Sequence, residues 1–176
     1  KFGIEVPKSV ADAMRLDTEN GNTLWMDAVV LEIASVNISF KHLDDGEEVP
    51  VGYQYIDCHM IFDVKLDGFR RKARMVAGGH MTEAPAVMTY ASVVSRESVR
   101  IALTLAALND LQVKASDVMN AYLTAPCEEK IWTILGPEFG GDAGKKALIV
   151  RALYGLKSAG ASFGRHLADC VGIYVL

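Results

Sequence analysis

The stretch Leu111–Leu123, which reads LQVKASDVMNAYL, says most about the fold of this chain. Apolar and polar residues alternate over residues 111–116, and this alternation predicts a β-strand. On that pattern Asp117 lies at the end of the apolar face of the strand. Burying a carboxylate there is costly unless it is paired or bound to a metal. Asp117 is therefore a candidate functional residue, and an aromatic ring, Tyr122, follows five residues later.

The composition describes a folded chain with no general affinity for nucleic acid. Of the 176 residues, 51% are hydrophobic, which favours a globular domain over disorder. The 18 Lys and Arg residues are outnumbered by 22 Asp and Glu residues, giving a net charge of −4. Phosphate affinity comes from clustered positive charge, so any nucleic-acid binding requires a local patch. No apolar run approaches the length of a membrane span, and we expect no membrane partner.

The three cysteines, Cys58, Cys127 and Cys170, are too few and too widely spaced for a disulfide framework. Their pattern indicates a reducing compartment and therefore an intracellular location. His59 follows Cys58, and His166 precedes Cys170 by four residues, but neither pair makes a four-ligand zinc pattern.

Hydrophobic periodicity predicts helices and strands in mixed order, which is typical of the α+β class. The clearest pair of strands is separated by Asp67-Gly68, a strong antiparallel hairpin signal. The predicted helices cover residues 9–16, capped by Ser9, 23–36, capped by Thr23, 96–109, capped by Ser95, and 159–170; the predicted strands cover residues 56–66, 69–77, 111–116, 130–135 and 147–152.

Three basic residues, Arg70, Lys72 and Arg74, share one face of the predicted strand 69–77, because side chains alternate with a period of two. Such a face could bind phosphate groups, and Arg71 could add charge nearby. Runs of charged residues usually lie on a solvated surface, so the pattern is compatible with a phosphate-binding face and with a solvated strand face.

The glycine-rich loop Gly140–Lys146 also invites comparison with a phosphate-binding loop. It lacks the full Walker spacing and the Ser or Thr that follows the lysine in such loops. The sequence therefore predicts an ordinary surface loop at this position.

Several short motifs, taken in order, resemble copia-type retrotransposon reverse transcriptases. Their order and spacing together make the resemblance specific over most of the chain. It implies an RNA-directed DNA polymerase with fingers over about residues 1–110, including a palm helix, and the N-terminal palm over about residues 111–176. The motifs are Trp25-x-x-Ala28-x-x-x-Glu32, Lys65-x-x-Gly68 with 71–77 (RKARMVA), 90–94 (YASVV), Val99-Arg100, 117–123 (DVMNAYL), 128–132 (EEKIW), 137–140 (PEFG) and 153–157 (LYGLK).

The resemblance also implies roles for particular residues. Asp117 is the catalytic carboxylate and binds Mg²⁺ together with the backbone carbonyl of Val118. Lys72 and Arg74 grip the triphosphate of the incoming nucleotide, and Tyr122 lies under its sugar and excludes a 2′-hydroxyl. The partners would be dNTP and an RNA or DNA template-primer. Without the resemblance, Asp117 as a turn cap and Tyr122 as a core residue are the simpler interpretations.

Two departures from the family pattern set limits on that expectation. After Lys157 the family has a Gln thought to lie near the nucleotide and template, and Ser158 is too short to replace it. The aromatic-x-Asp-Asp turn that supplies the other metal-binding carboxylates has no match in the chain. We therefore expect residues 1–176 to form a single, partial domain that is inactive alone. We also expect this chain either to self-associate through an uncovered strand edge or to be only marginally stable. The alternative is a non-catalytic remnant that only binds nucleic acid or protein.

Overall fold

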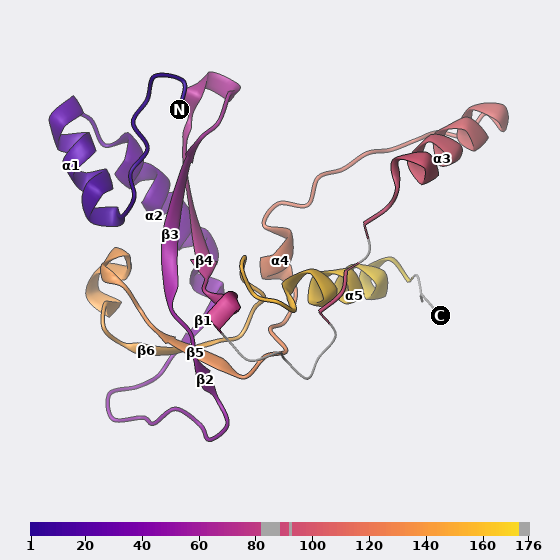
Figure 1. Cartoon of the computed structure of the whole chain (residues 1–176). Helices are drawn as coiled ribbons and strands as arrows, with labels where there is room; N and C mark the ends of the chain where they lie inside the picture. The colour runs from indigo at the N-terminus through magenta and orange to yellow at the C-terminus, as the bar shows by residue number, and fades with distance from the viewer. Residues whose placement is uncertain (82–88, 92, 173–176) are drawn as a thin grey trace.

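The computed structural model describes residues 1–81, 89–91 and 93–172 (Figure 1). Its mixed helices and strands agree with the predicted α+β class. The motif at residues 90–94 includes Ser92, which lies outside the described residues. The described elements are α1 (Val10–Asn20), α2 (Leu24–Val36), β1 (Phe40–His42), β2 (Gln54–Tyr55), β3 (Cys58–Val64), β4 (Arg71–Ala77), α3 (Arg96–Leu108), α4 (Ala121–Thr124), β5 (Ile131–Ile134), β6 (Lys146–Ile149) and α5 (Ala159–Val171).

Helix α1 begins as the sequence predicted and continues further. The Ser9 hydroxyl accepts a hydrogen bond from the Asp12 N–H at 3.1 Å, a standard N-terminal cap. The helix runs on to Asn20, past the predicted end at residue 16, and it ends at Gly21 with φ +63°. A left-handed glycine at this position is a common helix stop.

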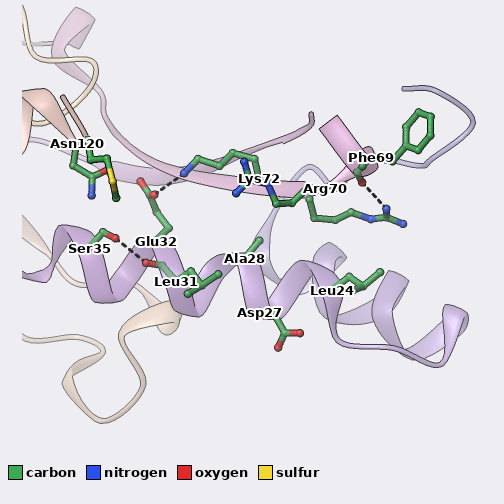
Figure 2. Close-up of a pocket in the computed structure, with 13 residues that line it drawn as sticks. Leu24, Asp27, Ala28, Leu31, Glu32, Ser35, Phe69, Arg70, Lys72 and Asn120 are labelled. Atoms are coloured by element: carbon green, nitrogen blue, oxygen red, sulfur yellow. Dashed lines mark hydrogen bonds and ion pairs between the residues drawn. The ribbon is translucent and has the colours of Figure 1, made fainter. Parts of the chain in front are cut away.

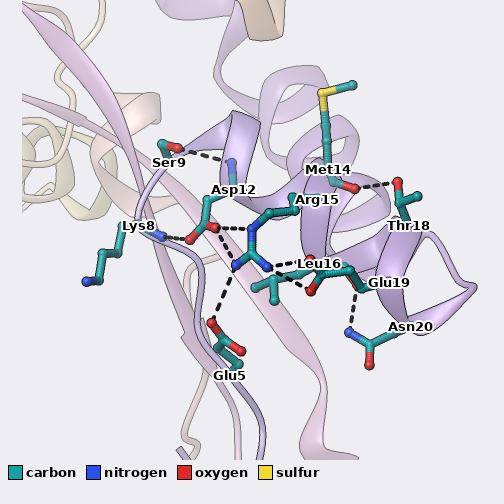
Figure 3. A network of polar contacts seen from close by, with 10 residues as sticks. All are labelled: Glu5, Lys8, Ser9, Asp12, Met14, Arg15, Leu16, Thr18, Glu19 and Asn20. Carbon is teal, nitrogen blue, oxygen red and sulfur yellow. Dashed lines mark hydrogen bonds and ion pairs between the residues drawn. The ribbon is translucent and has the colours of Figure 1, made fainter.

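A network of charged side chains on α1 holds the N-terminal segment against this helix (Figure 3). The Arg15 guanidinium lies 2.8 Å from Asp12, 2.7 Å from Glu19 and 3.5 Å from Glu5. Hydrogen bonds from the Lys8 N–H and from Arg15 hold the pKa of the Asp12 carboxyl below its usual range. The network thus ties residues before α1 to two turns of the helix.

Helix α2 is capped by a carboxylate from α1 rather than by Thr23. The two oxygens of Asp17 accept hydrogen bonds from the Trp25 and Met26 N–H groups at 3.1 and 2.9 Å. Thr23 makes no capping hydrogen bond, so that detail of the prediction is wrong. Asp17 is buried, and the two N–H donors compensate the loss of hydration of its carboxylate. Because the donors belong to the first turn of α2, these hydrogen bonds also join α1 to α2.

Strands β3 and β4 form the predicted antiparallel hairpin, in a register that pairs Cys58 with Ala77 and Val64 with Arg71. On β4 the side chains of Ala73, Met75 and Ala77 are buried, and the intervening side chains are half-buried. The buried face packs against α2, which lies behind the hairpin in Figure 1. The period-two pattern therefore predicted this strand and its inner face correctly.

A four-stranded sheet, in the order β1-β6-β5-β2, closes the other side of the core. The pairs β1–β6 and β5–β6 are antiparallel, whereas β2 pairs with β5 in parallel. The short strands β1 and β2 were not predicted from the sequence. Because β1 and β2 precede residue 110 and β5 and β6 follow it, both parts of the chain share one core.

Backbone contact joins the end of β4 to the turn Tyr154-Gly155. The Ala77 N–H donates to the Tyr154 carbonyl at 2.8 Å. Gly155 has φ +91°, and a Cβ added to it would overlap the Ala77 carbonyl oxygen. A Cβ on Gly79 would likewise overlap the carbonyl oxygen of Gly155. These two glycines let the hairpin and the C-terminal part of the chain approach closely.

The predicted strand at residues 111–116 is wrong. These residues are exposed and irregular, and no described strand pairs with them. Helix α3, capped by Ser95 as predicted, precedes them and has no buried residue. Figure 1 shows α3 standing apart from the rest of the described chain. An alternating pattern forms a strand only where a neighbour accepts its backbone hydrogen bonds, and none of the described strands lies there.

The last helix, α5, was predicted correctly within one residue and packs against the short helix α4. Within the described ranges, every helix is too short or too polar to span a membrane.

Candidate functional site

Lys72 and Arg74 project from the half-buried face of β4, opposite the buried side chains of Ala73 and Met75. Their backbone is fixed on one side by β3 and at its end by the bond from Ala77 to Tyr154. The two cationic side chains therefore stand on a rigid strand, although each has a partner from elsewhere in the chain.

Arg74 and Tyr122 meet on the same aromatic ring. The Arg74 guanidinium lies 4.3 Å from the centroid of the Tyr154 ring, a cation–π contact. The Tyr122 ring lies 4.9 Å from the Tyr154 ring and 6.1 Å from Phe163 of α5. The structure thus brings together two of the predicted site residues through Tyr154, a residue of the LYGLK motif at residues 153–157 for which no role was predicted.

Lys72 pairs with a buried carboxylate of α2. Its Nζ lies 3.6 Å from Glu32 Oε2, and Glu32 Oε1 accepts a hydrogen bond from the Met75 N–H at 3.0 Å. Glu32 is only 6% exposed. The sequence offered two signals for this residue. Glu32 closes the Trp25-x-x-Ala28-x-x-x-Glu32 motif, and it lies at helical spacing on the same stripe as the apolar residues Trp25, Val29 and Val36.

A cleft of about 560 Å³ lies between α2 and β4 and contains this ion pair (Figure 2). One wall carries the basic residues Arg70, Arg71 and Lys72. Met119 and Asn120, which follow Asp117 and Val118 in the chain, complete the lining. Part of the 117–123 motif and Lys72 therefore line the same cleft. Its other lining residues include Leu24, Asp27, Ala28, Leu31 and Glu32.

Asp117 itself is exposed and lies outside the lining of this cleft, and Val118 is 44% exposed. Among the described residues, no three His, Cys, Asp or Glu side chains come together as a possible metal site. Two magnesium ions need several oxygen ligands between them, and one exposed carboxylate does not fit that requirement. The described residues therefore do not assemble a complete metal-ligand set around Asp117 and the Val118 carbonyl.

Ser158 faces the protein interior. Its hydroxyl donates to Glu129 Oε1 at 2.5 Å, and its N–H donates to the same oxygen at 3.1 Å. The side chain is buried at the start of α5, where Glu129 satisfies it. Where the family pattern has a longer Gln, this chain uses the position to anchor a helix.

The remaining candidates behave as ordinary structural features. The Gly140–Lys146 segment lies mostly on the surface, as predicted, although residues 140–142 end a short 3-10 helix and Lys146 begins β6. Lys145 is paired to Asp142 at 2.7 Å. Burial raises the pKa of the Cys58 thiol to about 11 and that of the Cys127 thiol to about 12. Both thiols are therefore poor nucleophiles near neutral pH.

Comparison with known proteins places the chain in a family. Residues 45–172 match the family described as reverse transcriptase (RNA-dependent DNA polymerase), and the chain belongs to that family. The copia-type resemblance inferred from the motifs is thereby confirmed. No solved structure matches the chain.

Two relatives are polyproteins of transposons. The chain is 36% identical over 121 residues to the retrovirus-related Pol polyprotein from transposon TNT 1-94 of Nicotiana tabacum. This match covers 64% of this chain and 9% of the relative. The chain is also 31% identical over 125 residues to the truncated transposon Ty1-A Gag-Pol polyprotein of Saccharomyces cerevisiae. This match covers 70% of this chain and 10% of the relative. The matched region is thus about a tenth of each relative's length.

Proposed function

We propose that this chain is the part of a retrotransposon RNA-directed DNA polymerase that grips the incoming nucleotide, within a longer polyprotein. The observation that carries the proposal is the meeting of Arg74 and Tyr122 on the Tyr154 ring, with Lys72 two residues away on the same face of β4. Residues far apart in the sequence converge there on one surface that combines cations with aromatic rings.

The chemistry of these side chains suits a nucleoside triphosphate. Guanidinium and ammonium groups donate charge-assisted hydrogen bonds to phosphate oxygens, and Arg74 can do so bidentately. Tyr122 is half-buried between Tyr154 and Phe163, so its ring is held in place. A fixed ring beneath a sugar would exclude a 2′-hydroxyl by contact, which selects deoxynucleotides.

For Asp117 we propose a more limited part. Bound magnesium would activate the attacking 3′-hydroxyl and steady the leaving pyrophosphate in a polymerase of this family. In this chain Asp117 and the carbonyl of Val118 supply a fraction of the ligand set. We further propose that residues 1–110 form the fingers with the palm helix and that residues 111–176 belong to the palm. Template-primer would then bind across both regions.

Nucleotide affinity tests the proposal directly. Titration calorimetry with a dNTP should show binding that falls by about tenfold or more in the Lys72→Ala, Arg74→Ala double variant, because two charge-assisted contacts are lost. The matched control removes two exposed lysines, Lys41 and Lys130, and should keep the affinity of the parent chain. Equal losses in both double variants would show that the face of β4 is only solvated.

Primer extension tests the part assigned to Asp117. The isolated chain should extend no templated primer with magnesium or manganese, because one carboxylate does not hold two ions. Measurable extension that disappears in Asp117→Ala would contradict this expectation. Binding of nucleic acid without any binding of dNTP would instead support a non-catalytic remnant.

A further inference from the structure

Glu32 is an unusual residue for the inner face of a helix. It is 6% exposed, and its helix presents Trp25, Val29 and Val36 to the core on the same side. A buried carboxylate destabilises a fold unless hydrogen bonds and an opposite charge compensate it. Its two oxygens have different partners, the Met75 N–H and the Lys72 ammonium.

The first of these contacts fixes the second. Because Oε1 is held 3.0 Å from the backbone of β4, the carboxylate cannot rotate away, and Oε2 stays directed at Lys72. Figure 2 shows the Lys72 side chain extending along the strand toward Glu32, with Asn120 beyond Glu32 at the left of the view. A lysine side chain has four rotatable bonds, so this restraint removes most of its freedom before any ligand binds.

We infer that Glu32 is a positioning residue for Lys72, holding its ammonium at the cleft so that a phosphate oxygen meets a preorganised donor. An ammonium carries three N–H donors, and a contact with one carboxylate oxygen leaves others for a phosphate. The inference rests on the proposed function, since it assumes that Lys72 binds the triphosphate. The competing explanation is that Glu32 only satisfies the Met75 N–H at the outer edge of β4.

Two substitutions at Glu32 separate these explanations. Glu32→Gln keeps a carbonyl oxygen for the Met75 N–H but removes the charge that holds Lys72, whereas Glu32→Ala removes both. Thermal unfolding should rank the parent chain and Glu32→Gln above Glu32→Ala. Calorimetry with inorganic tripolyphosphate should instead show both variants weakened, by about threefold or more, as expected when a charge-assisted contact loses its preorganisation.

A double-mutant cycle with Lys72→Met makes the test specific. In the parent chain Lys72→Met should weaken tripolyphosphate binding by about tenfold, and in the Glu32→Gln background its effect should fall to about threefold or less. An equal effect in both backgrounds would overturn the inference, as would tighter binding by Glu32→Gln. No effect of Lys72→Met in the parent chain would instead contradict the proposed function, so the two failures are distinguishable.

Asp17 provides the matched control. It is also a buried carboxylate that accepts backbone N–H bonds, but both of its partners are the N–H groups of Trp25 and Met26. Asp17→Asn should lower the melting temperature and leave tripolyphosphate affinity unchanged. If Glu32→Gln fails to fold, Glu32→Asp takes its place, because a shorter carboxylate keeps the charge but loses its reach. Unchanged affinity in a folded Glu32→Asp chain would overturn the inference.

Discussion

The β3–β4 hairpin and the segment from α3 to Asn120 have equally clear patterns in the sequence but very different surroundings in the structure. On β4, Ala73, Met75 and Ala77 are buried against α2. In α3 no residue is buried, and Leu103, Leu105 and Leu108 are at least half exposed. Periodicity therefore identifies the face that a segment can bury, whereas the presence of a neighbour decides whether that face is buried.

The same difference divides the candidate site. Lys72, Arg74 and Tyr122 belong to the packed region and have defined partners, whereas Asp117 lies in the exposed segment. In this chain, the residues proposed to bind the nucleotide are therefore better organised than the residue proposed to bind metal.

The largest effect should come from the core itself. Leu153 is fully buried, and Leu153→Ala should lower the free energy of unfolding by about 2–5 kcal/mol through lost contacts and a cavity. Leu105 of α3 is 54% exposed, and Leu105→Ala should change the free energy of unfolding by no more than about 0.5 kcal/mol. Urea unfolding of the two variants measures both. Equal losses would show that α3 is buried in solution and would break the contrast between the two regions.

A somewhat smaller loss of stability is expected from a substitution where the β3–β4 hairpin meets the Tyr154-Gly155 turn. Gly155→Ala should lower the free energy of unfolding by about 2–4 kcal/mol, because the new Cβ sits on a left-handed backbone and clashes with the Ala77 carbonyl oxygen. Gly144 has a similar φ of +83° but open space around it, so Gly144→Ala should lower the free energy of unfolding by only about 1 kcal/mol. Thermal unfolding compares the two variants. A similar cost at both positions would mean that the close backbone approach contributes little.

The smallest effect concerns the charged network on α1. The pKa of Asp12 is lowered in the folded chain by the Lys8 N–H and by Arg15. Its contribution to stability is therefore fully present above the ordinary value of 3.8 and is lost as the pH falls below it. Asp12→Asn should flatten the pH dependence of stability in that acidic range. A pH dependence identical to that of the parent chain would show that solvent screens the network completely.

The sequence predicted elements well where one local rule was sufficient. The Ser9 and Ser95 caps, the hairpin around Asp67-Gly68 and the alternation on β4 each depend on a few neighbouring residues, and each is present. The strand at 111–116 failed because strands require partners that periodicity does not specify. Strands β1 and β2 are only three and two residues long, too short for any periodic signal.

The candidate site was predicted in part for the same reason. Alternation along the strand placed Lys72 and Arg74 on one face from sequence alone. Glu32 and Tyr154 reach them from α2 and from the turn before α5, and such contacts depend on tertiary packing. The role of Ser158 also depends on Glu129, 29 residues earlier. No local pattern could have specified these pairs.

The most direct test of the account is to map dNTP binding on the whole chain by NMR. Addition of a dNTP should shift the signals of Lys72 and Arg74 on β4 and of the Tyr122 and Tyr154 rings, while those of α1 remain in place. The loop Gly140–Lys146 is the internal comparison, since it is glycine-rich and basic but lacks the features of a phosphate loop. Shifts centred on that loop, or an absence of shifts on β4, would contradict the account.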